Sequence, residues 1–137
     1  MPKELKFRVW DKESKLMMPV EELIWDKGAI YLIWALRAED GEDGIGYDMA
    51  PDEAQIMQFT GLHDSQGREI YEGDVVRISW ETDDGEHPST VGLVDFADGS
   101  FYVKTRTGGY YYWTGYEVEV LGNVHQNPEL LEGLTCK

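Results

Sequence analysis

Short stretches of alternating apolar and polar residues recur along the chain, and they predict a mainly β protein. Leu5 to Trp10 alternates Leu, Phe and Val with Lys and Arg, the pattern of a strand with one buried face, and Asp11–Ser14 follows as a turn. Next, Leu23–Trp25 and Ala29–Leu36 are predicted to form a hairpin around the glycine-containing connection Asp26–Gly28. The second arm is a continuous apolar run, so a short buried helix is the alternative for it.

The segment from Arg37 to Glu53 is acidic, rich in glycine and weakly patterned. Such a composition is typical of an exposed loop or of the boundary between two lobes. At 137 residues the chain has the size of one domain. We therefore expect a single domain, 1–137, with an N-terminal β lobe over 1–53 and a barrel-like lobe over 54–137.

The second half is predicted to hold a denser set of strands. A strand over Gln55–Thr60 precedes a turn at His63–Gly67. Further strands are expected over Val75–Trp80, Val91–Phe96, Phe101–Thr105, Tyr110–Trp113 and Glu117–Leu121, with a hairpin turn at Ala97–Gly99. Short strands joined by Gly and Asp turns predict a small curled sheet or SH3-like pseudo-barrel. Pro128–Glu132 is predicted to form a short C-terminal helical turn with Asn127 as its candidate cap.

The formal net charge of -15 changes the functional picture. A nucleic-acid backbone is bound by clustered Lys and Arg, so direct DNA or RNA binding is not expected. Acidic residues cluster over 39–44 and 81–86, where interleaved glycines predict solvated loops. The alternative is that these carboxylates meet a basic partner or imitate the charge of DNA.

No group of residues specifies a reaction. His63, His87 and His125 lack metal-ligand spacing, and no Ser stands in a Gly-x-Ser-x-Gly turn. Residues 40–44 resemble a calcium loop in composition, but their spacing does not fit one. Cys136 stands beside the last residue, where support for a reactive thiol is not expected. We therefore expect no enzymatic activity, no cofactor and no metal.

Cysteine usage and hydropathy indicate a compartment. A single cysteine fits a reducing cytoplasm, and no apolar run reaches the length of a membrane span. The chain also begins without an apolar leader segment. The protein is accordingly expected in the cytoplasm, without membrane association.

Clustered aromatic residues are the strongest candidates for binding. The candidate binding residues are Tyr102, Tyr110, Tyr111, Tyr112, Trp113 and Tyr116. Successive side chains of a strand point to opposite faces, so one aromatic pair of the 110–113 stretch should fill the core while the other stays outside. Exposed tyrosines make good interface anchors. The alternative is that cross-strand aromatic pairs only stabilise the sheet.

Three segments together resemble the YopX family of phage and prophage proteins. They are Phe7–Asp11; Met57–Asp64 running on through Gly67 and Ile70–Val75; and Glu117–Val124 running on to Asn127–Leu131. The resemblance implies genes carried by phages and prophages of Gram-positive bacteria, a mainly β pseudo-barrel fold and oligomer formation. It implies no established activity and brings no catalytic residues.

Two functions follow from these observations. The first is a phage accessory protein of unknown biochemical role that acts through protein–protein contact, with a protein partner or with itself as a homo-oligomer. The alternative is an acidic DNA mimic that occupies a basic nucleic-acid-binding protein of the host.

Overall fold

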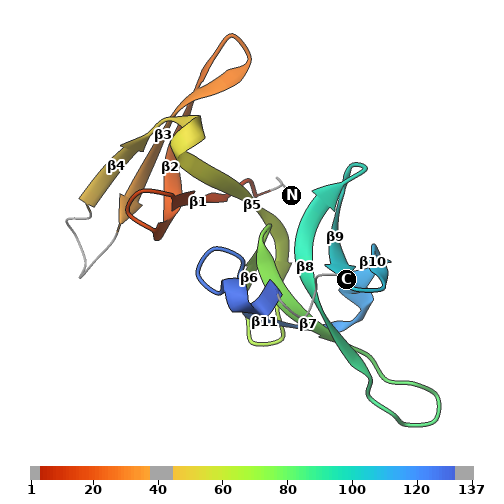
Figure 1. Ribbon diagram of the computed structural model, residues 1–137. Helices are drawn as coiled ribbons and strands as arrows, with labels where there is room; N and C mark the ends of the chain where they lie inside the picture. The colour runs from red at the N-terminus through yellow and green to blue at the C-terminus, as the bar shows by residue number, and fades with distance from the viewer. Residues whose placement is uncertain (1–3, 38–44, 132–137) are drawn as a thin grey trace. The chain divides into compact units, whose positions relative to one another are not determined.

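The computed structural model describes residues 4–37 and 45–131 (Figure 1). Its strands pair antiparallel throughout, and helical structure is confined to short 3-10 turns within these residues. The expectation of a mainly β protein is confirmed. The chain forms two compact units, residues 1–58 and 59–137, where the sequence predicted lobes of 1–53 and 54–137.

Unit 1 is a sheet with the strand order β4-β3-β2-β1-β5. Its strands are β1 (Phe7–Asp11), β2 (Leu16–Asp26), β3 (Ala29–Arg37), β4 (Ile45–Met49) and the first half of β5 (Ala54–His63), and the 3-10 turn η1 (Pro51–Glu53) precedes β5. The cross-strand register places the buried residues Val9, Met18, Ile33, Ala35, Met49 and Ala54 on one face. This alternation gives unit 1 a core on one side of its sheet.

The β2–β3 hairpin turns at Lys27 and Gly28, with Asp26 opposite Ala29. Both turn residues have positive φ, 52° and 83°, as a tight hairpin turn requires. The second arm is the strand β3, so the helical alternative for residues 29–36 is wrong.

The exposed loop that was one expectation for Arg37–Glu53 is wrong in the described part of this segment. Residues 45–49 form β4, which pairs with β3, and Pro51–Glu53 form η1. Gly46 weakens the strand pattern in the sequence, yet the indole of Trp34 lies where a Cβ on Gly46 would stand. An aromatic ring over a glycine replaces the missing side chain, which explains why this poorly patterned stretch still forms a strand.

Unit 2 is a second sheet with the strand order β10-β9-β8-β7-β11. Its strands are β7 (Asp74–Ser79), β8 (Ser89–Ala97), β9 (Ser100–Thr105), β10 (Gly108–Tyr110) and β11 (Glu117–Asn123); β6 (Glu69–Tyr71) pairs with the second half of β5. The β8–β9 hairpin turns at Asp98 and Gly99, both with positive φ. The ladder ends at β10 and β11, so this sheet is open and the closed-barrel form of the SH3-like expectation is not confirmed.

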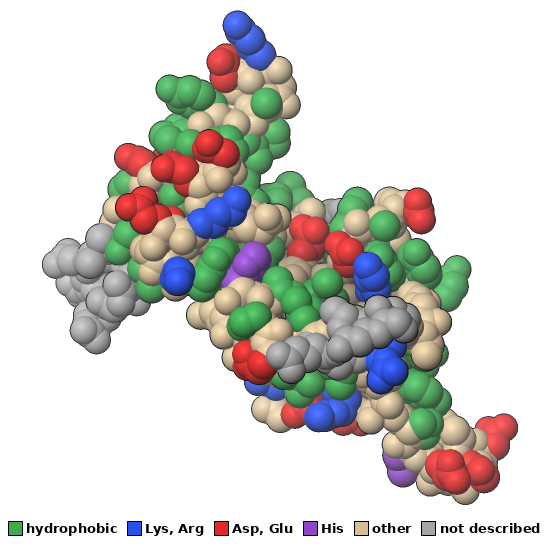
Figure 2. All heavy atoms as spheres, in the orientation of Figure 1, with side chains coloured by type: hydrophobic (Ala, Val, Ile, Leu, Met, Phe, Trp, Pro, Cys, Tyr) green, Lys and Arg blue, Asp and Glu red, His purple; other side chains and the backbone are tan. Residues whose placement is uncertain are grey.

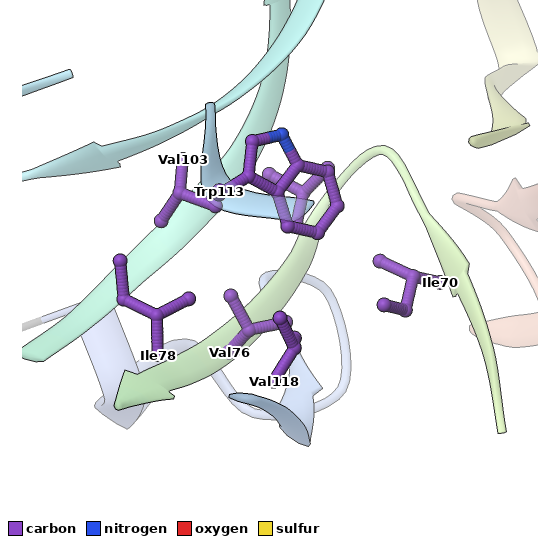
Figure 3. Close-up of a cluster of buried hydrophobic side chains, with 7 residues drawn as sticks. Ile70, Val76, Ile78, Val103, Trp113 and Val118 are labelled. Atoms are coloured by element: carbon purple, nitrogen blue, oxygen red, sulfur yellow. The ribbon is translucent and has the colours of Figure 1, made fainter. Parts of the chain in front are cut away.

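The core of unit 2 is built around Trp113, which is 2% exposed. Figure 3 shows its indole among Ile70, Val76, Ile78, Val103 and Val118. The indole Nε1–H donates a hydrogen bond to the carbonyl oxygen of Phe101 at 3.2 Å. A buried tryptophan with its one donor satisfied is a strong fold determinant.

Residues 110–113 do not form the predicted strand. β10 ends at Tyr110, and Trp113 opens the 3-10 turn η2 (Trp113–Gly115). The chain turns here because the indole of Trp113 packs inward. The predicted C-terminal turn is the 3-10 turn η3 (Pro128–Leu131), while the side-chain Oδ1 of Asn127 accepts the N–H of Asn123 at 3.2 Å.

A buried carboxylate joins the turn after β5 to the edge strand β11. Asp64 Oδ1 accepts the N–H groups of Gln66 and Arg68, both at 2.9 Å. Its Oδ2 accepts Arg68 Nε at 2.9 Å and the N–H of Val120 at 3.0 Å. Burial acts to raise the pKa of Asp64, but the hydrogen bonds from Val120, Arg68 and Gln66 outweigh it and hold that pKa below its usual value.

Candidate functional site

The six candidate aromatic residues divide into an inner and an outer group. Trp113 is buried, and Tyr110 and Tyr116 pack half-buried against the same core with Trp80. The Trp80–Tyr116 and Trp80–Tyr110 ring centroids are 5.2 and 6.1 Å apart. Ring packing of this kind stabilises a sheet, which is what the structural alternative expects of these residues.

The outer group is Tyr102, Tyr111 and Tyr112. Tyr102 is half-buried on β9, whereas Tyr111 and Tyr112 follow β10 and are 45% and 90% exposed. The rings of Tyr102 and Tyr111 stack with centroids 4.8 Å apart and an interplanar angle of 13°. Unit 2 therefore exposes aromatic surface beyond what its core uses.

Gly109 makes room for this stack. A Cβ on Gly109 would lie 3.0 Å from Cδ2 of Tyr102 and 3.2 Å from Cε2 of Tyr111. These separations are tighter than ordinary van der Waals contact, so a side chain here would push the rings away. The glycine that interrupts the sequence pattern thus lets both rings lie close to the backbone of β10.

An open groove of about 770 Å³ runs beside the stacked rings. Its lining comes from β8, β9, the β9–β10 turn, β10 with the residue after it, and η3: Leu93, Tyr102, Lys104, Thr105, Arg106, Thr107, Gly108, Gly109, Tyr111 and Leu131. Leu93 and Lys104 are cross-strand partners and share the outer face of the sheet with Tyr102. The groove falls within the usual volume range of binding sites, about 300 to 1,000 Å³.

Charges of both signs flank the aromatic pair. Lys104 and Arg106 line the groove, and both are exposed. Asp95 lies directly opposite Tyr102 in the β8–β9 ladder. Burial raises the pKa of Tyr102, and Asp95, Tyr111 and Asp98 act in the same direction, so the phenol remains protonated and able to donate near neutral pH.

This arrangement suits binding: it offers flat rings, two cations and hydroxyl groups along one open groove. Sequence reasoning found its tyrosines but missed Lys104, Arg106 and Gly109. One signal was present, because Lys and Arg are scarce in the second half of a strongly acidic chain and two of them stand almost side by side.

The acidic loop over 81–86 is an ordered turn at the tip of the β7–β8 hairpin, visible as red spheres at the lower right of Figure 2. Thr82 N–H donates to the carbonyl oxygen of Glu86 at 2.9 Å, and the Thr82 hydroxyl donates to Asp84. The Thr82 hydroxyl and the N–H of Glu86 hold the pKa of Asp84 below its usual value. These hydrogen bonds hold the Asp84 carboxylate in place and favour its ionised form.

The other candidate residues do not come together. Over residues 4–37 and 45–131, no three His, Cys, Asp or Glu side chains meet as metal ligands would. His63 packs its ring edgewise against Phe59, with centroids 5.6 Å apart, and His87 lines a separate shallow hollow beside Trp80. The calcium-like residues 40–44, the acidic cluster 39–44 and Cys136 lie outside the described residues.

Unit 1 also exposes aromatic residues that the sequence did not single out. Trp25 and Tyr31, near the tip of the β2–β3 hairpin, are 59% and 63% exposed. Because they belong to unit 1, they serve as a comparison for the aromatic surface of unit 2. In the described part of the chain, none of the helical turns could cross a membrane.

Comparison with known proteins places the chain in a family. The family model described as YopX protein matches residues 6–132. The SPbeta prophage-derived uncharacterized protein YopX of Bacillus subtilis is 40% identical in sequence over 142 aligned positions, covering 93% of this chain and 96% of that protein.

Two solved structures share the fold. Protein EF1440 of Enterococcus faecalis superimposes with a TM-score of 0.64 at 28% identity, covering 95% of this chain and 99% of that one. Protein yopX of Bacillus subtilis gives a TM-score of 0.60 at 29% identity over 92% and 97% of the two chains. None of these descriptions names an enzymatic activity. The chain belongs to the YopX protein family.

Proposed function

We propose that this protein is a non-enzymatic prophage accessory protein of the cytoplasm that acts through protein–protein contact, using the outer aromatic surface of unit 2. The prophage origin is carried over from the Bacillus subtilis relative, whose name states it. The contact surface comprises Tyr102, Tyr111 and Tyr112.

The exposure of Tyr111 and Tyr112 carries the proposal. A tyrosine that is 90% exposed contributes little to the core, whereas in a complex it can bury a large area with few rotatable bonds. Stacking on Tyr102 holds the ring of Tyr111 in place before any partner binds. Such preorganisation reduces the entropy lost on binding.

The test compares two matched double variants with the wild type. Tyr111→Ser with Tyr112→Ser removes the proposed surface; Trp25→Ser with Tyr31→Ser removes exposed aromatic area from unit 1. Native mass by light scattering and affinity capture from a Gram-positive host lysate are measured for all three. A partner or self-association lost only in the Tyr111/Tyr112 variant supports the proposal, and equal behaviour of both variants contradicts it.

The alternative, mimicry of DNA's charge, is supported by the net charge of -15 and by the ordered acidic tip over 81–86. The salt dependence of partner binding distinguishes the two functions. A contact between carboxylates and a basic partner weakens steeply between about 0.15 and 1 M salt, while an aromatic contact changes little. A basic partner that is released at high salt, and that the Tyr111/Tyr112 variant still binds, would favour mimicry.

A further inference from the structure

The cations of unit 2 have an uneven distribution. Up to residue 131, unit 2 contains Arg68, Arg77, Lys104 and Arg106. Two of them, Lys104 and Arg106, are exposed and line the groove beside the tyrosine stack, whereas Arg68 and Arg77 are not among the residues that line it. A small cationic site therefore stands on a unit whose other charges are mostly acidic.

Aromatic and cationic groups occupy different parts of this site. Tyr102 and Lys104 project from the same face of β9, with Val103 between them pointing into the core. Arg106 follows in the β9–β10 turn, while the Tyr111 ring lies over Tyr102. A ligand along the groove would thus meet flat rings first and two positive charges next.

We propose that this groove binds an acidic peptide segment of a partner protein, one that carries an aromatic residue beside its carboxylates. The carboxylates would lie against Lys104 and Arg106, and the partner's ring would pack on Tyr111 and Tyr102. This inference rests on the proposed function and specifies its partner.

Charge favours a peptide over a nucleic-acid strand. Single-stranded nucleic acid also stacks on tyrosines, but it brings a phosphate with every base and needs a longer track of cations. Here Asp95 lies directly opposite Tyr102, and Asp98 lies in the hairpin turn beyond it, away from Lys104, so both would repel a continuing phosphate backbone. A short acidic segment can end before it reaches them.

An NMR titration of the full chain tests the inference with defined probes. Three peptides of equal length are compared: alternating glutamate and tryptophan, alternating lysine and tryptophan, and alternating glutamate and serine. An oligothymidylate is the nucleic-acid probe. We expect the glutamate–tryptophan peptide to shift the backbone amides of residues 102–111 and to bind on the order of tenfold more tightly than the other probes.

Charge reversal supplies the matched variants. Lys104→Glu with Arg106→Glu should weaken the glutamate–tryptophan peptide roughly tenfold and strengthen the lysine–tryptophan peptide. Lys12→Glu with Lys27→Glu makes the same change in net charge, but on unit 1, and should leave the affinities for both peptides nearly unchanged. Folding of each variant is checked from its amide spectrum.

Three outcomes would overturn the inference: preferential binding of oligothymidylate, amide shifts centred elsewhere, or equal effects of the two charge-reversal pairs. A concentration-dependent increase in mass that Lys104→Glu with Arg106→Glu abolishes would assign the groove to a second copy instead. The acidic-peptide inference can fail while the proposed protein-contact function still holds. A partner captured by the Lys104/Arg106 variant but not by the Tyr111/Tyr112 variant contradicts only the acidic-peptide inference.

Discussion

The carboxylate of Asp64 accepts a hydrogen bond from the backbone N–H of Val120 at 3.0 Å, across 56 positions of the chain. Beside it, the N–H of Ser65 donates to the carbonyl oxygen of Val118 at 2.8 Å. Through these hydrogen bonds, the turn that follows β5 pairs with the outer edge of β11. Two of the three segments that carry the family resemblance thus meet here, which identifies them as determinants of the fold.

Replacing Asp64 should destabilise unit 2 strongly. The Asp64 side chain is fully buried, and Asp64→Asn would remove its charge and place an amide donor among groups that all donate. We expect a loss of about 3 to 5 kcal/mol in the free energy of unfolding. Urea denaturation measures it, and the exposed Asp83→Asn is the control, with a change within about 0.5 kcal/mol. Equal stability of the two variants would contradict the assigned role of Asp64.

Asp64 should also make the free energy of unfolding depend on pH. Its pKa is held below 3.8 in the folded protein, so the unfolded chain takes up a proton first as pH falls. The stabilisation is therefore complete above about pH 4, the unfolded value, and is lost as pH falls through the lower folded pKa. Urea denaturation of the wild type and Asp64→Asn from pH 7 down to pH 3 should show their stability difference shrinking below about pH 4. A stability difference between the two proteins that stays constant over this pH range would contradict a lowered pKa for Asp64.

Trp113 should matter for stability, and its neighbour Tyr112 should not. Trp113→Ala removes a buried indole from the core of unit 2 and should cost about 3 to 5 kcal/mol of unfolding free energy. Tyr112→Ala, at a side chain that is 90% exposed, should stay within about 0.5 kcal/mol. Thermal and urea denaturation of both variants check this contrast. Similar losses at the two positions would mean that Tyr112 is not an outer residue.

Gly109→Ala should disturb the tyrosine stack without straining the backbone. The new methyl group would press on the Tyr102 and Tyr111 rings, and the φ of Gly109 is not in the left-handed region. We expect changed ring-proton shifts for Tyr111 in NMR spectra and weaker binding by the groove. Gly115→Ala meets no atom within 4 Å and is the control. Unchanged Tyr111 shifts in Gly109→Ala would show that the stack does not depend on this glycine.

The hairpins could be predicted from sequence because local chemistry determines them. Asp98 and Gly99 stand between two alternating apolar runs, and both adopt the positive φ that such a turn needs. The turn at Lys27 and Gly28 was located less accurately, since lysine is not a usual residue at positive φ.

Contacts between distant residues could not be predicted in the same way. In β4 the ring of Trp34 covers Gly46, and within residues 110–113 the side chain of Trp113 is buried in the core of unit 2. The groove arises where η3, the β9–β10 turn and the Tyr102–Tyr111 stack meet, which no local pattern encodes. Composition could identify the tyrosines as a group, but only packing separates the inner ones from the outer ones.

Site-specific photocrosslinking tests the protein-contact function most directly. A benzophenone amino acid is placed at Tyr112 in one variant and at Tyr31, on unit 1, in another, and both are irradiated in host cells. The aromatic surface of unit 2 predicts a discrete adduct from position 112, identifiable by mass spectrometry, and none of the same mass from position 31. Absence of an adduct at 112, or the same adduct from both positions, would contradict the function proposed for this surface.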